Sequence, residues 1–309
     1  MQTIRNYLSL IKFSHTIFAM PFALIGFFLG VQHGPPERYL NLNHSIGWGW
    51  DPGTGMWWQA YLRIFILVIL CMVMARSAAM AFNRYLDKNF DALNPRTAIR
   101  EIPAGIVSAN SALWFTIVCS LLFMLFAFFL NPLCFYLSPV ALAVILGYSY
   151  TKRFTPLCHL ILGLGLSLAP IGAYLAVTAQ FALVPVLFSI AVLLWVSGFD
   201  IIYSLQDEEF DKANNLHSIP AAVGKEKALK ISEALHTACA LVLLGVYVYS
   251  DFGWLYISGW IIFITMLTYQ HAIVKPHDLS RVNLAFMTAN GIASIVFATF
   301  VISDLVFLK

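Results

Sequence analysis

"YLRIFILVILCMVMARSAAMAFNRYLDKNFD", residues 61–91, is an apolar run that ends in regularly spaced polar residues. A run of about 20 apolar residues is long enough to cross a bilayer as a helix. Asn83, Asp87 and Asp91 follow at intervals of four, which places them on one face of a helix. The stretch therefore predicts a membrane helix that carries an amide and two carboxylates along one side of its end.

The composition of the whole chain is that of an integral membrane protein. It has 309 residues, of which 60% are hydrophobic and 11% are charged, whereas a soluble domain has about 25% charged residues. We expect an all-α fold and a single polytopic domain over residues 1–309. The apolar runs predict nine transmembrane helices, at residues 14–31, 58–86, 111–130, 134–150, 157–178, 183–206, 228–250, 253–273 and 283–306.

Most of the Lys and Arg residues fall in alternate connections between the predicted spans. Such residues favour the cytoplasmic side, so we expect the N-terminus in the cytoplasm and a bacterial inner or plasma membrane. The stretch at 4–13 has the pattern of an amphipathic helix on the membrane surface. The basic residues assigned to the cytoplasmic side are Arg5, Lys12, Lys88, Arg96, Arg100, Lys152, Arg153, Lys212, Lys225, Lys227, Lys230, Lys275 and Arg281.

The connection at 32–57 is long and rich in tryptophan. Trp48, Trp50, Trp57 and Trp58 lie in it or just after it. Indole rings favour the depth of the lipid headgroups. We expect these four side chains to anchor the protein at the outer interface.

A second acidic motif lies 120 residues after the first. Asp207 and Asp211 repeat the spacing of Asp87 and Asp91, and an "IPA" tripeptide follows each pair. Asp200 and Ser204 extend the second row on the same helical face. Neighbouring carboxylates repel one another, and Mg²⁺ binds carboxylates together with substrate phosphates. Two facing acidic rows at the cytoplasmic side are therefore predicted to hold Mg²⁺, with two ions expected, against a diphosphate.

Basic residues are predicted at the same level as the carboxylates. Lys152 and Arg153 end "GYSYTKR", and Arg96 and Arg100 follow the first motif. They either bind diphosphate oxygens or only mark a cytoplasmic loop. Arg76 differs because it lies inside a predicted span, where a charge is costly and is a functional candidate. It either binds the carboxylate of an acidic co-substrate or pairs with an aspartate.

Several kinds of site are missing from the sequence. It has no glycine-rich phosphate loop, no zinc-ligand spacing and no nucleic-acid motif, so no nucleic-acid partner is expected. The five cysteines lie in apolar runs and form no CxxC pair, which is typical of buried packing residues.

With these motifs in place, most of the chain resembles the UbiA-type membrane prenyltransferases. Asn83, Asp87 and Asp91 are similar to the NxxxDxxxD motif of that family. "NPRTAIREIPAG" at 94–105 and "YSYTKR" at 148–153 are similar to its Arg-Thr and YxxxK-type segments. "DIIYSLQDEEFD" at 200–211 is similar to its second acidic motif. Many members have Asp directly after the first Asn, where this chain has Arg84.

The resemblance implies a helical bundle around a central cavity that opens sideways to lipid. It implies Mg²⁺-dependent transfer of a polyprenyl chain from its diphosphate to the ring of an aromatic hydroxy acid. The branch it resembles acts on 4-hydroxybenzoate in ubiquinone and menaquinone biosynthesis. An alternative acceptor is 1,4-dihydroxy-6-naphthoate, in the futalosine route to menaquinone.

The resemblance also implies roles for individual residues. Asp87, Asp91, Asp207 and Asp211 are the expected metal ligands and catalytic residues. Either Asp200 or the released diphosphate takes the proton from the ring. The expected substrate-binding residues are Arg76, Asn83, Arg96, Tyr148, Lys152, Arg153, Tyr203 and Gln206.

A transporter is the alternative from another class of protein. Intramembrane acids and a two-half architecture are common in transporters. The acids of this chain, however, cluster at one predicted face of the membrane and not at its midplane. That distribution favours the enzyme.

Overall fold

The computed structural model describes residues 2–11, 20–34 and 57–308, and these residues are almost entirely helical. Within these ranges the extended pairing is limited to an isolated bridge between Lys275 and Asp278. The elements are α1 (Gln2–Leu10), α2 (Met20–His33), α4 (Trp57–Leu93), α5 (Ala109–Leu130), α6 (Pro132–Thr151), α7 (Cys158–Thr178), α8 (Leu183–Ser204), a 3₁₀ turn (Leu205–Asp207), α9 (Glu208–Ala213), α10 (Ile219–Val223), α11 (Lys225–Tyr249), α12 (Trp254–Ile273), a π-helix (Leu284–Ala289) and α13 (Asn290–Phe307).

Seven of the described helical stretches are long and apolar enough to cross a membrane. They make the chain a multi-pass membrane protein, and the predicted all-α class is confirmed. Of the nine predicted spans, the one at 14–31 appears as the 14-residue α2, and its first residues lie outside the described ranges. The one at 253–273 appears as the 20-residue α12, which is not among these seven. The count of nine therefore stays a prediction.

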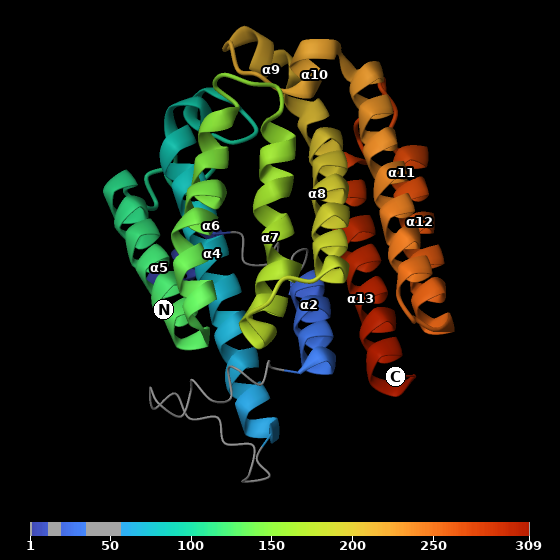
Figure 1. The fold of residues 1–309 in the computed structure, drawn as a ribbon. Coiled ribbons are helices and arrows are strands. Elements are labelled where there is room, and N and C mark those ends of the chain that lie inside the picture. Colours follow the sequence, from blue (N-terminus) through green and yellow to red (C-terminus); the bar gives the residue numbers. More distant parts are fainter. Residues whose placement is uncertain (1, 12–19, 35–56, 309) are drawn as a thin grey trace.

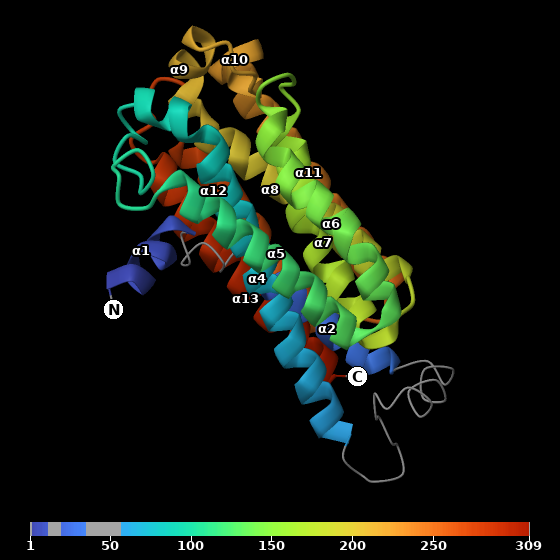
Figure 2. The ribbon, with the colours of Figure 1, turned by 90° about the vertical axis from the view of Figure 1, so that its left-hand side faces the viewer.

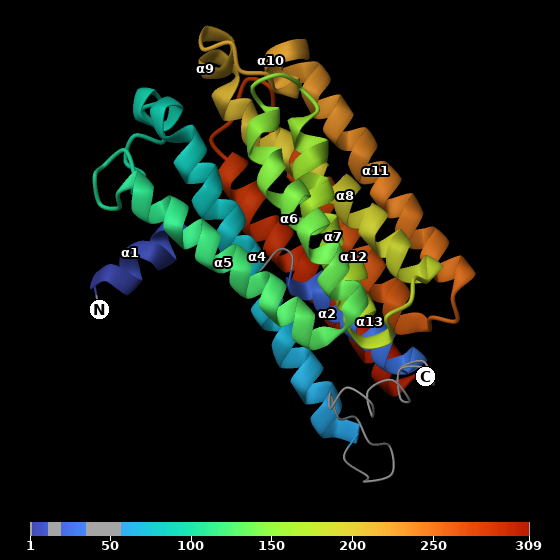
Figure 3. The same ribbon diagram turned by 60° about the vertical axis from the view of Figure 1, so that its left-hand side comes forward.

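The long helices run side by side as a bundle with one elaborated end (Figure 1). α9 and α10 lie at this end, together with the C-terminal end of α4 and the connection after it (Figure 3). We call it the motif end, because both acidic motifs are found there. α1 lies at the outside of the bundle (Figure 2), where Leu10 is buried in a cluster with Ala81 and Val107.

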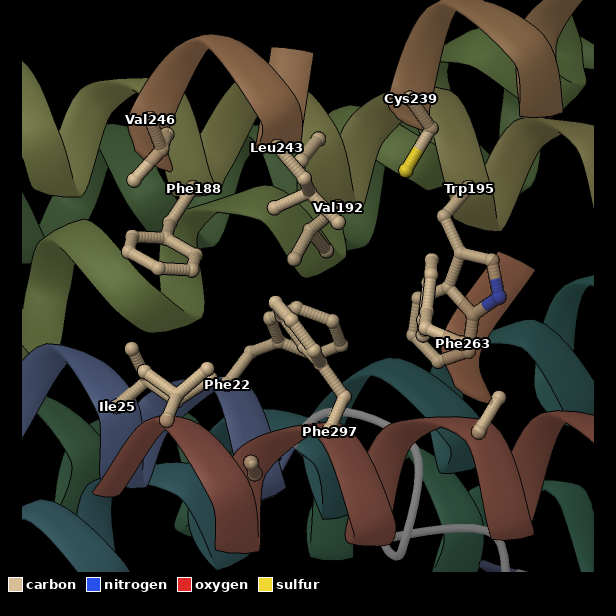
Figure 4. Close-up of a cluster of buried hydrophobic side chains, with 14 of the residues drawn as sticks. Phe22, Ile25, Phe188, Val192, Trp195, Cys239, Leu243, Val246, Phe263 and Phe297 are labelled. Carbon is tan, nitrogen blue, oxygen red and sulfur yellow. The ribbon is translucent and has the colours of Figure 1, made fainter. Parts of the chain in front are cut away.

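The core is built from aromatic side chains of helices that are distant in the sequence. Figure 4 shows Phe22 of α2, Phe188 of α8 and Phe297 of α13 pointing toward one another. The ring centroids of Phe22 and Phe297 are 6.1 Å apart, within the range of favourable aromatic pairs. Because lipid is as apolar as these side chains, close packing rather than escape from water holds the helices together.

Two glycines let the helix backbones approach closely. A Cβ at Gly26 would lie 2.0 Å from the carbonyl oxygen of Pro170, and one at Gly163 would lie 2.6 Å from that of Leu193. Small residues at such crossings are typical of membrane bundles. They fix α7 against α2 on one side and against α8 on the other.

α4 extends seven residues beyond the predicted end of its span, from 86 to Leu93. No Gly or Pro interrupts it before Pro95, and the residue before a proline is disfavoured in a helix. The Thr97 hydroxyl then donates to the carbonyl oxygen of Asp91 at 3.1 Å. Asp87 and Asp91 therefore lie on the last turns of one continuous helix.

The second acidic motif does not form the continuous helical row that its spacing predicts. α8 ends at Ser204, a 3₁₀ turn covers Leu205–Asp207, and α9 begins at Glu208. In a 3₁₀ turn each residue advances by a third of a turn, so the face that carries Asp200 is not the face that carries Asp211. The expectation of one row from 200 to 211 is corrected accordingly.

Most of the helix predicted at 4–13 corresponds to α1, which ends at Leu10, and residues 12 and 13 lie outside the described ranges. The predicted interfacial anchors Trp48 and Trp50 also lie outside them, as do the side chains of Trp57 and Trp58.

Candidate active site

The first acidic motif is joined to the connection after α6. Asp87 Oδ2 accepts a hydrogen bond from Asn83 Nδ2 at 3.0 Å, one helical turn away. Arg153 Nη2 lies 3.3 Å from Asp87 Oδ1 and also donates to the carbonyl oxygen of Leu86 at 2.9 Å. Arg153 thus neutralises Asp87 from the connection after α6.

Asp91 is buried between Arg84, which the sequence analysis did not assign to the site, and Arg100, which it named as a candidate for binding diphosphate oxygens. Arg100 Nη1 donates to Asp91 Oδ1 at 2.6 Å. Arg84 Nη1 lies 3.9 Å from Asp91 Oδ2, which is too long for a hydrogen bond. Asp91 Oδ2 is therefore a buried carboxylate oxygen without a hydrogen-bond partner.

Residues that follow the first motif hold Asp207 of the second motif. Arg96 makes a bidentate contact with Asp207: its Nε lies 3.1 Å from Oδ1, and its Nη2 contacts Oδ2. Asn94 Nδ2 donates to the same Oδ1 at 3.3 Å. Arg96 Nη1 also donates to the Tyr203 hydroxyl at 2.9 Å. Burial alone would lower the pKa of Arg96, but the charges and hydrogen bonds of Asp207 and Tyr203 together outweigh burial and raise this pKa.

Asp211 is fully buried and is held from two sides. Lys152 Nζ lies 2.7 Å from its Oδ1, and the Ser218 hydroxyl donates to its Oδ2 at 2.8 Å. Burial alone would lower the pKa of Lys152, but the adjacent carboxylate of Asp211 raises it above its usual value. Lys152 is therefore held as a cation beside Asp211.

The two acidic motifs face one shared region. Lys152 and Arg153 are adjacent in the chain, and each binds an aspartate of a different motif. The charge of Lys152 also acts on Asp87 and on Asp207. The four aspartates and their basic partners therefore form one charge-balanced cluster at the motif end.

The donor set of this cluster suits a hard cation. Within the described ranges, no three His, Cys, Asp or Glu side chains converge as a ready metal site, because each of the four aspartates is paired with a basic group. The carboxylates of this cluster offer only oxygen atoms as ligands, however, and Mg²⁺ prefers oxygen ligands. The buried oxygen of Asp91 without a partner is a further position that such an ion fits.

A mainly apolar cavity of about 370 Å³ lies between α4, α5, α6 and α7. Arg76 and Tyr148 are among the residues that line this cavity, and both have polar side chains. Arg76 Nε is buried without a hydrogen-bond partner. Tyr148 interacts electrostatically with Arg76, Asp87 and Asp200. The polar part of the cavity therefore lies close to the acidic cluster.

Asp200 has a partner that the sequence analysis missed. His159 Nδ1 lies 2.6 Å from Asp200 Oδ2, and the His159 side chain is 3% exposed. His159 lies in an apolar run with no recognisable motif, 41 residues before Asp200. No local sequence signal marks it.

The remaining predicted residues have local roles in this structure. Gln206 Nε2 donates to the carbonyl oxygen of Tyr203 at 3.2 Å, which makes it a turn contact. The Tyr203 ring packs against Phe286 of the π-helix, with centroids 4.3 Å apart. Besides His159, the site residues that sequence reasoning missed are Arg84, Asn94 and Ser218.

A multi-pass helical bundle with a charge-balanced cluster at one end and an apolar cavity beside it defines the class of this protein as a membrane enzyme. Residues 48–292 match the model of the UbiA prenyltransferase family, and the chain belongs to that family. The predicted family and the prediction of an enzyme are confirmed. The alternative of a transporter is wrong.

Curated relatives resemble the chain over most of its length. A protein of Aeromonas hydrophila is 30% identical over 244 residues, covering 79% of this chain and 84% of the relative. One of Nitrosospira multiformis is 28% identical over 277 residues, covering 87% of this chain and 95% of the relative. Both relatives are named 4-hydroxybenzoate octaprenyltransferase.

Solved structures share the fold. The apo structure of a UbiA homolog from Aeropyrum pernix K1 has a TM-score of 0.78 and 32% identity, covering 94% of this chain and 98% of the homolog. A UbiA homolog from Archaeoglobus fulgidus bound to DMAPP and Mg²⁺ has a TM-score of 0.72 and 19% identity, covering 98% and 99%. At that identity the second likeness concerns the fold alone.

Proposed function

We propose that this enzyme transfers a polyprenyl chain from its diphosphate to the ring of an aromatic hydroxy acid of the 4-hydroxybenzoate type. The observation that carries the proposal is that Lys152 and Arg153 hold one aspartate from each motif beside an apolar cavity. Such a site suits a substrate with an anionic head and an apolar tail. The names of the curated relatives support the choice of acceptor.

The acidic residues of the cluster would hold magnesium. Asp87, Asp91, Asp207 and Asp211 supply the oxygen ligands, two ions are proposed, and Asn83 orients Asp87. When bound, Mg²⁺ neutralises charge on the diphosphate and on the leaving group. The basic partners of the aspartates then become available for the diphosphate oxygens.

Arg96, Lys152 and Arg153 stabilise the departing diphosphate. Negative charge grows on its oxygens as the bond to the allylic carbon breaks, and charge-assisted hydrogen bonds from these side chains strengthen in step with it. They lie at the motif end before substrate binds, because aspartates already hold them there. Little reorganisation is then needed during the reaction.

The apolar cavity receives the prenyl chain and keeps water away from the allylic cation. Its walls come from α4, α5, α6 and α7. Exclusion of water prevents hydrolysis of a reactive intermediate. Wall residues that a prenyl chain would contact include Met72, Phe123, Leu137, Val144, Leu166 and Ile171.

The aromatic acid binds where the cavity becomes polar. Arg76 lines the cavity, and its Nε lacks a hydrogen-bond partner, so we assign it to the carboxylate of the acceptor. Tyr148 lies at the same level. The electron-rich ring then attacks the allylic carbon, and either Asp200 or the released diphosphate takes the ring proton.

We place this reaction in quinone biosynthesis, toward ubiquinone or menaquinone. We also propose that the motif end faces the cytoplasm of a bacterial cell, as the distribution of Lys and Arg favours. The chain over 1–309 then acts as one catalytic unit in the membrane.

The test uses the purified full chain in detergent with Mg²⁺ and geranyl diphosphate. 4-Hydroxybenzoate and 1,4-dihydroxy-6-naphthoate are offered separately, and the products are identified by mass. We expect prenylated 4-hydroxybenzoate that depends on Mg²⁺. A product with the naphthoate alone would overturn the proposed acceptor, and no product with either acid would overturn the proposed activity.

A further inference from the structure

A buried histidine connects Asp200 to the residues that hold the second acidic motif. His159 lies on the first turn of α7, Asp200 lies on α8, and Nδ1 of the one is 2.6 Å from Oδ2 of the other. The other ring nitrogen, Nε2, lies 3.3 Å from the backbone nitrogen of Ile219 at the start of α10. His159 therefore bridges α8 and α10.

The backbone contact fixes which nitrogen of His159 carries the proton. The Ile219 N–H can only donate, so His159 Nε2 accepts. A neutral imidazole has one donor nitrogen and one acceptor nitrogen, so Nδ1 carries the hydrogen and donates to Asp200. Asp200 is thereby held as an acceptor, which is the state that a base requires.

The packing of α7 leaves His159 little freedom to move. Its carbonyl oxygen accepts a hydrogen bond from the Ser197 hydroxyl at 3.2 Å. One turn along α7, a Cβ at Gly163 would lie 2.6 Å from the carbonyl oxygen of Leu193. The helices thus meet closely beside the pair, and the imidazole is locked relative to Asp200.

The same bridge reaches the cluster proposed to bind the diphosphate. Ser218 caps α10 just before Ile219, and its hydroxyl donates to Asp211 Oδ2 at 2.8 Å. Asp211 in turn holds Lys152. Hydrogen bonds therefore connect Asp211 to Ser218 and Ile219 to His159 and on to Asp200, and the backbone between Ser218 and Ile219 joins the two parts of this path.

We propose that His159 is a positioning residue that holds Asp200 as the base for the ring proton; this inference rests on the proposed function. The allylic C–O bond breaks, and its electron pair leaves with the diphosphate. A π electron pair of the ring forms the new carbon–carbon bond. The C–H electron pair then restores aromaticity, and the proton passes to the Asp200 oxygen that His159 does not hold.

A purely structural histidine would also be buried and hydrogen-bonded. Two observations favour the positioning role. The partner of His159 Nδ1 is a carboxylate with a side chain 22% exposed, not a backbone oxygen of the core. That carboxylate also interacts with Tyr148, which lines the cavity. Asp200 therefore lies within electrostatic range of a residue of the cavity wall, on the side where the cavity becomes polar.

Two matched substitutions separate the two nitrogens of His159. In His159→Asn the amide nitrogen reaches the position of Nδ1 and can still donate to Asp200. In His159→Gln the longer amide reaches the position of Nε2 and can still accept from Ile219, while the donor to Asp200 is lost. Thermal unfolding in detergent shows whether both variants fold.

The assay uses Mg²⁺, geranyl diphosphate and 4-hydroxybenzoate with either hydrogen or deuterium at the ring carbons beside the hydroxyl. In His159→Gln we expect kcat to fall about 100-fold, the loss that misplacement of a catalytic group by about 1 Å can cause. A primary isotope effect absent from the wild type should appear, because proton loss becomes limiting. The KM for geranyl diphosphate should stay unchanged. His159→Asn should retain most of the activity.

The outcomes distinguish this inference from the proposed function. Equal losses in the two variants, a wild-type rate in His159→Gln, or a wild-type rate in Asp200→Asn would overturn the inference while transfer by the wild-type chain stands. Absence of any prenylated acid from the wild-type chain would overturn the proposed function, and the inference with it.

Discussion

Lys152 Nζ and Asp211 Oδ1 lie 2.7 Å apart at the motif end, and Asp211 is fully buried. A buried carboxylate without a cation is strongly destabilising, so Lys152 stabilises the fold in the absence of substrate. Arg153 has the same relation to Asp87 on the neighbouring helix. The substrate-free site thus balances its own charges and exchanges partners when a diphosphate binds.

The first prediction concerns the pH dependence of stability. Because Asp211 raises the pKa of Lys152 above its ordinary 10.5, the pair stabilises the folded chain fully below that pH. The contribution is lost as pH rises through the folded pKa. Lys152→Arg keeps the charge at higher pH, since the pKa of arginine exceeds about 12. The thermal midpoint of Lys152→Arg should therefore fall less steeply than that of the wild type between about pH 10 and about pH 12.

The matched control for this prediction is Lys227→Arg. Lys227 is exposed at the start of α11, so its replacement should leave the wild-type profile unchanged. Equal slopes for Lys152→Arg and the wild type would contradict a stabilising Lys152–Asp211 pair.

The second prediction concerns the acidic motifs. Asp87→Ala and Asp207→Ala should each lower transfer by at least about 100-fold, as expected when a group that stabilises transition-state charge is lost. Asp207→Ala also frees Arg96, so Asp207→Asn, which keeps the side-chain volume, should be compared by thermal unfolding. Glu209→Gln, at an exposed position of α9, is the control and should transfer at the wild-type rate. Wild-type activity in either alanine variant would remove that aspartate from the site.

The third prediction concerns metal binding. Each aspartate already has a basic partner, so Mg²⁺ alone must compete with these cations. Mg²⁺ together with inorganic diphosphate supplies an anion that the basic groups can bind instead. The pair of ligands should therefore raise the thermal midpoint more than the sum of the two separate effects, and a chelator should abolish both this shift and transfer. An equally large shift with Mg²⁺ alone would contradict the exchange of partners.

Much of this site could be predicted because its residues lie in patterned segments. The spacing of Asn83, Asp87 and Asp91 matches a helix period, and the structure places all three on the end of α4. The spacing misled at the second motif, where the chain leaves α8 at Ser204 and turns through a 3₁₀ segment. The sequence pattern identifies the aspartates of the second motif, whereas the break in the helix between them depends on packing at the motif end.

The sequence analysis missed Arg84 and His159, and the physical reason differs between the two. Arg84 reaches Asp91 from another turn of α4. His159 reaches Asp200 across two packed helices. Arg84 lies seven residues before Asp91 on α4, a spacing that places both on one helical face, so the sequence does carry a signal for that pair. The contact of His159 does not follow from spacing within one helix, because it depends on how close α7 and α8 approach. The close crossing at Gly163 was equally invisible in the sequence.

The fourth prediction concerns Arg76, which lines the cavity with a buried Nε that has no hydrogen-bond partner. Removing a buried unsatisfied group costs the fold little and can stabilise it. We expect Arg76→Met to raise the thermal midpoint or leave it unchanged. The KM for 4-hydroxybenzoate should rise at least about 10-fold, the effect of losing about 1.4 kcal/mol of binding. The KM for geranyl diphosphate should stay constant.

The outcome that contradicts this role is specific. If the KM for the aromatic acid is unchanged in Arg76→Met while kcat falls, then Arg76 acts on the cluster and not on the carboxylate of the acceptor. Arg63→Met, a change to an exposed arginine near the other end of α4, is the control. It should leave both KM values unchanged.

The fifth prediction concerns the length of the prenyl chain. Gly172 of α7 lines the cavity, and a Cβ there would meet no atom within 4 Å. Gly172→Phe therefore adds a ring inside the cavity without breaking a packing contact, and it removes a glycine from a helix interior, which favours folding. Transfer from a long prenyl diphosphate should fall at least about 10-fold more than transfer from geranyl diphosphate, because one or two lost methylene contacts already change discrimination by that factor. Gly245→Phe, on the exposed face of α11, is the control and should leave the ratio of the two rates unchanged. An equal loss for both donors in Gly172→Phe would show that the chain does not pass this point of the cavity.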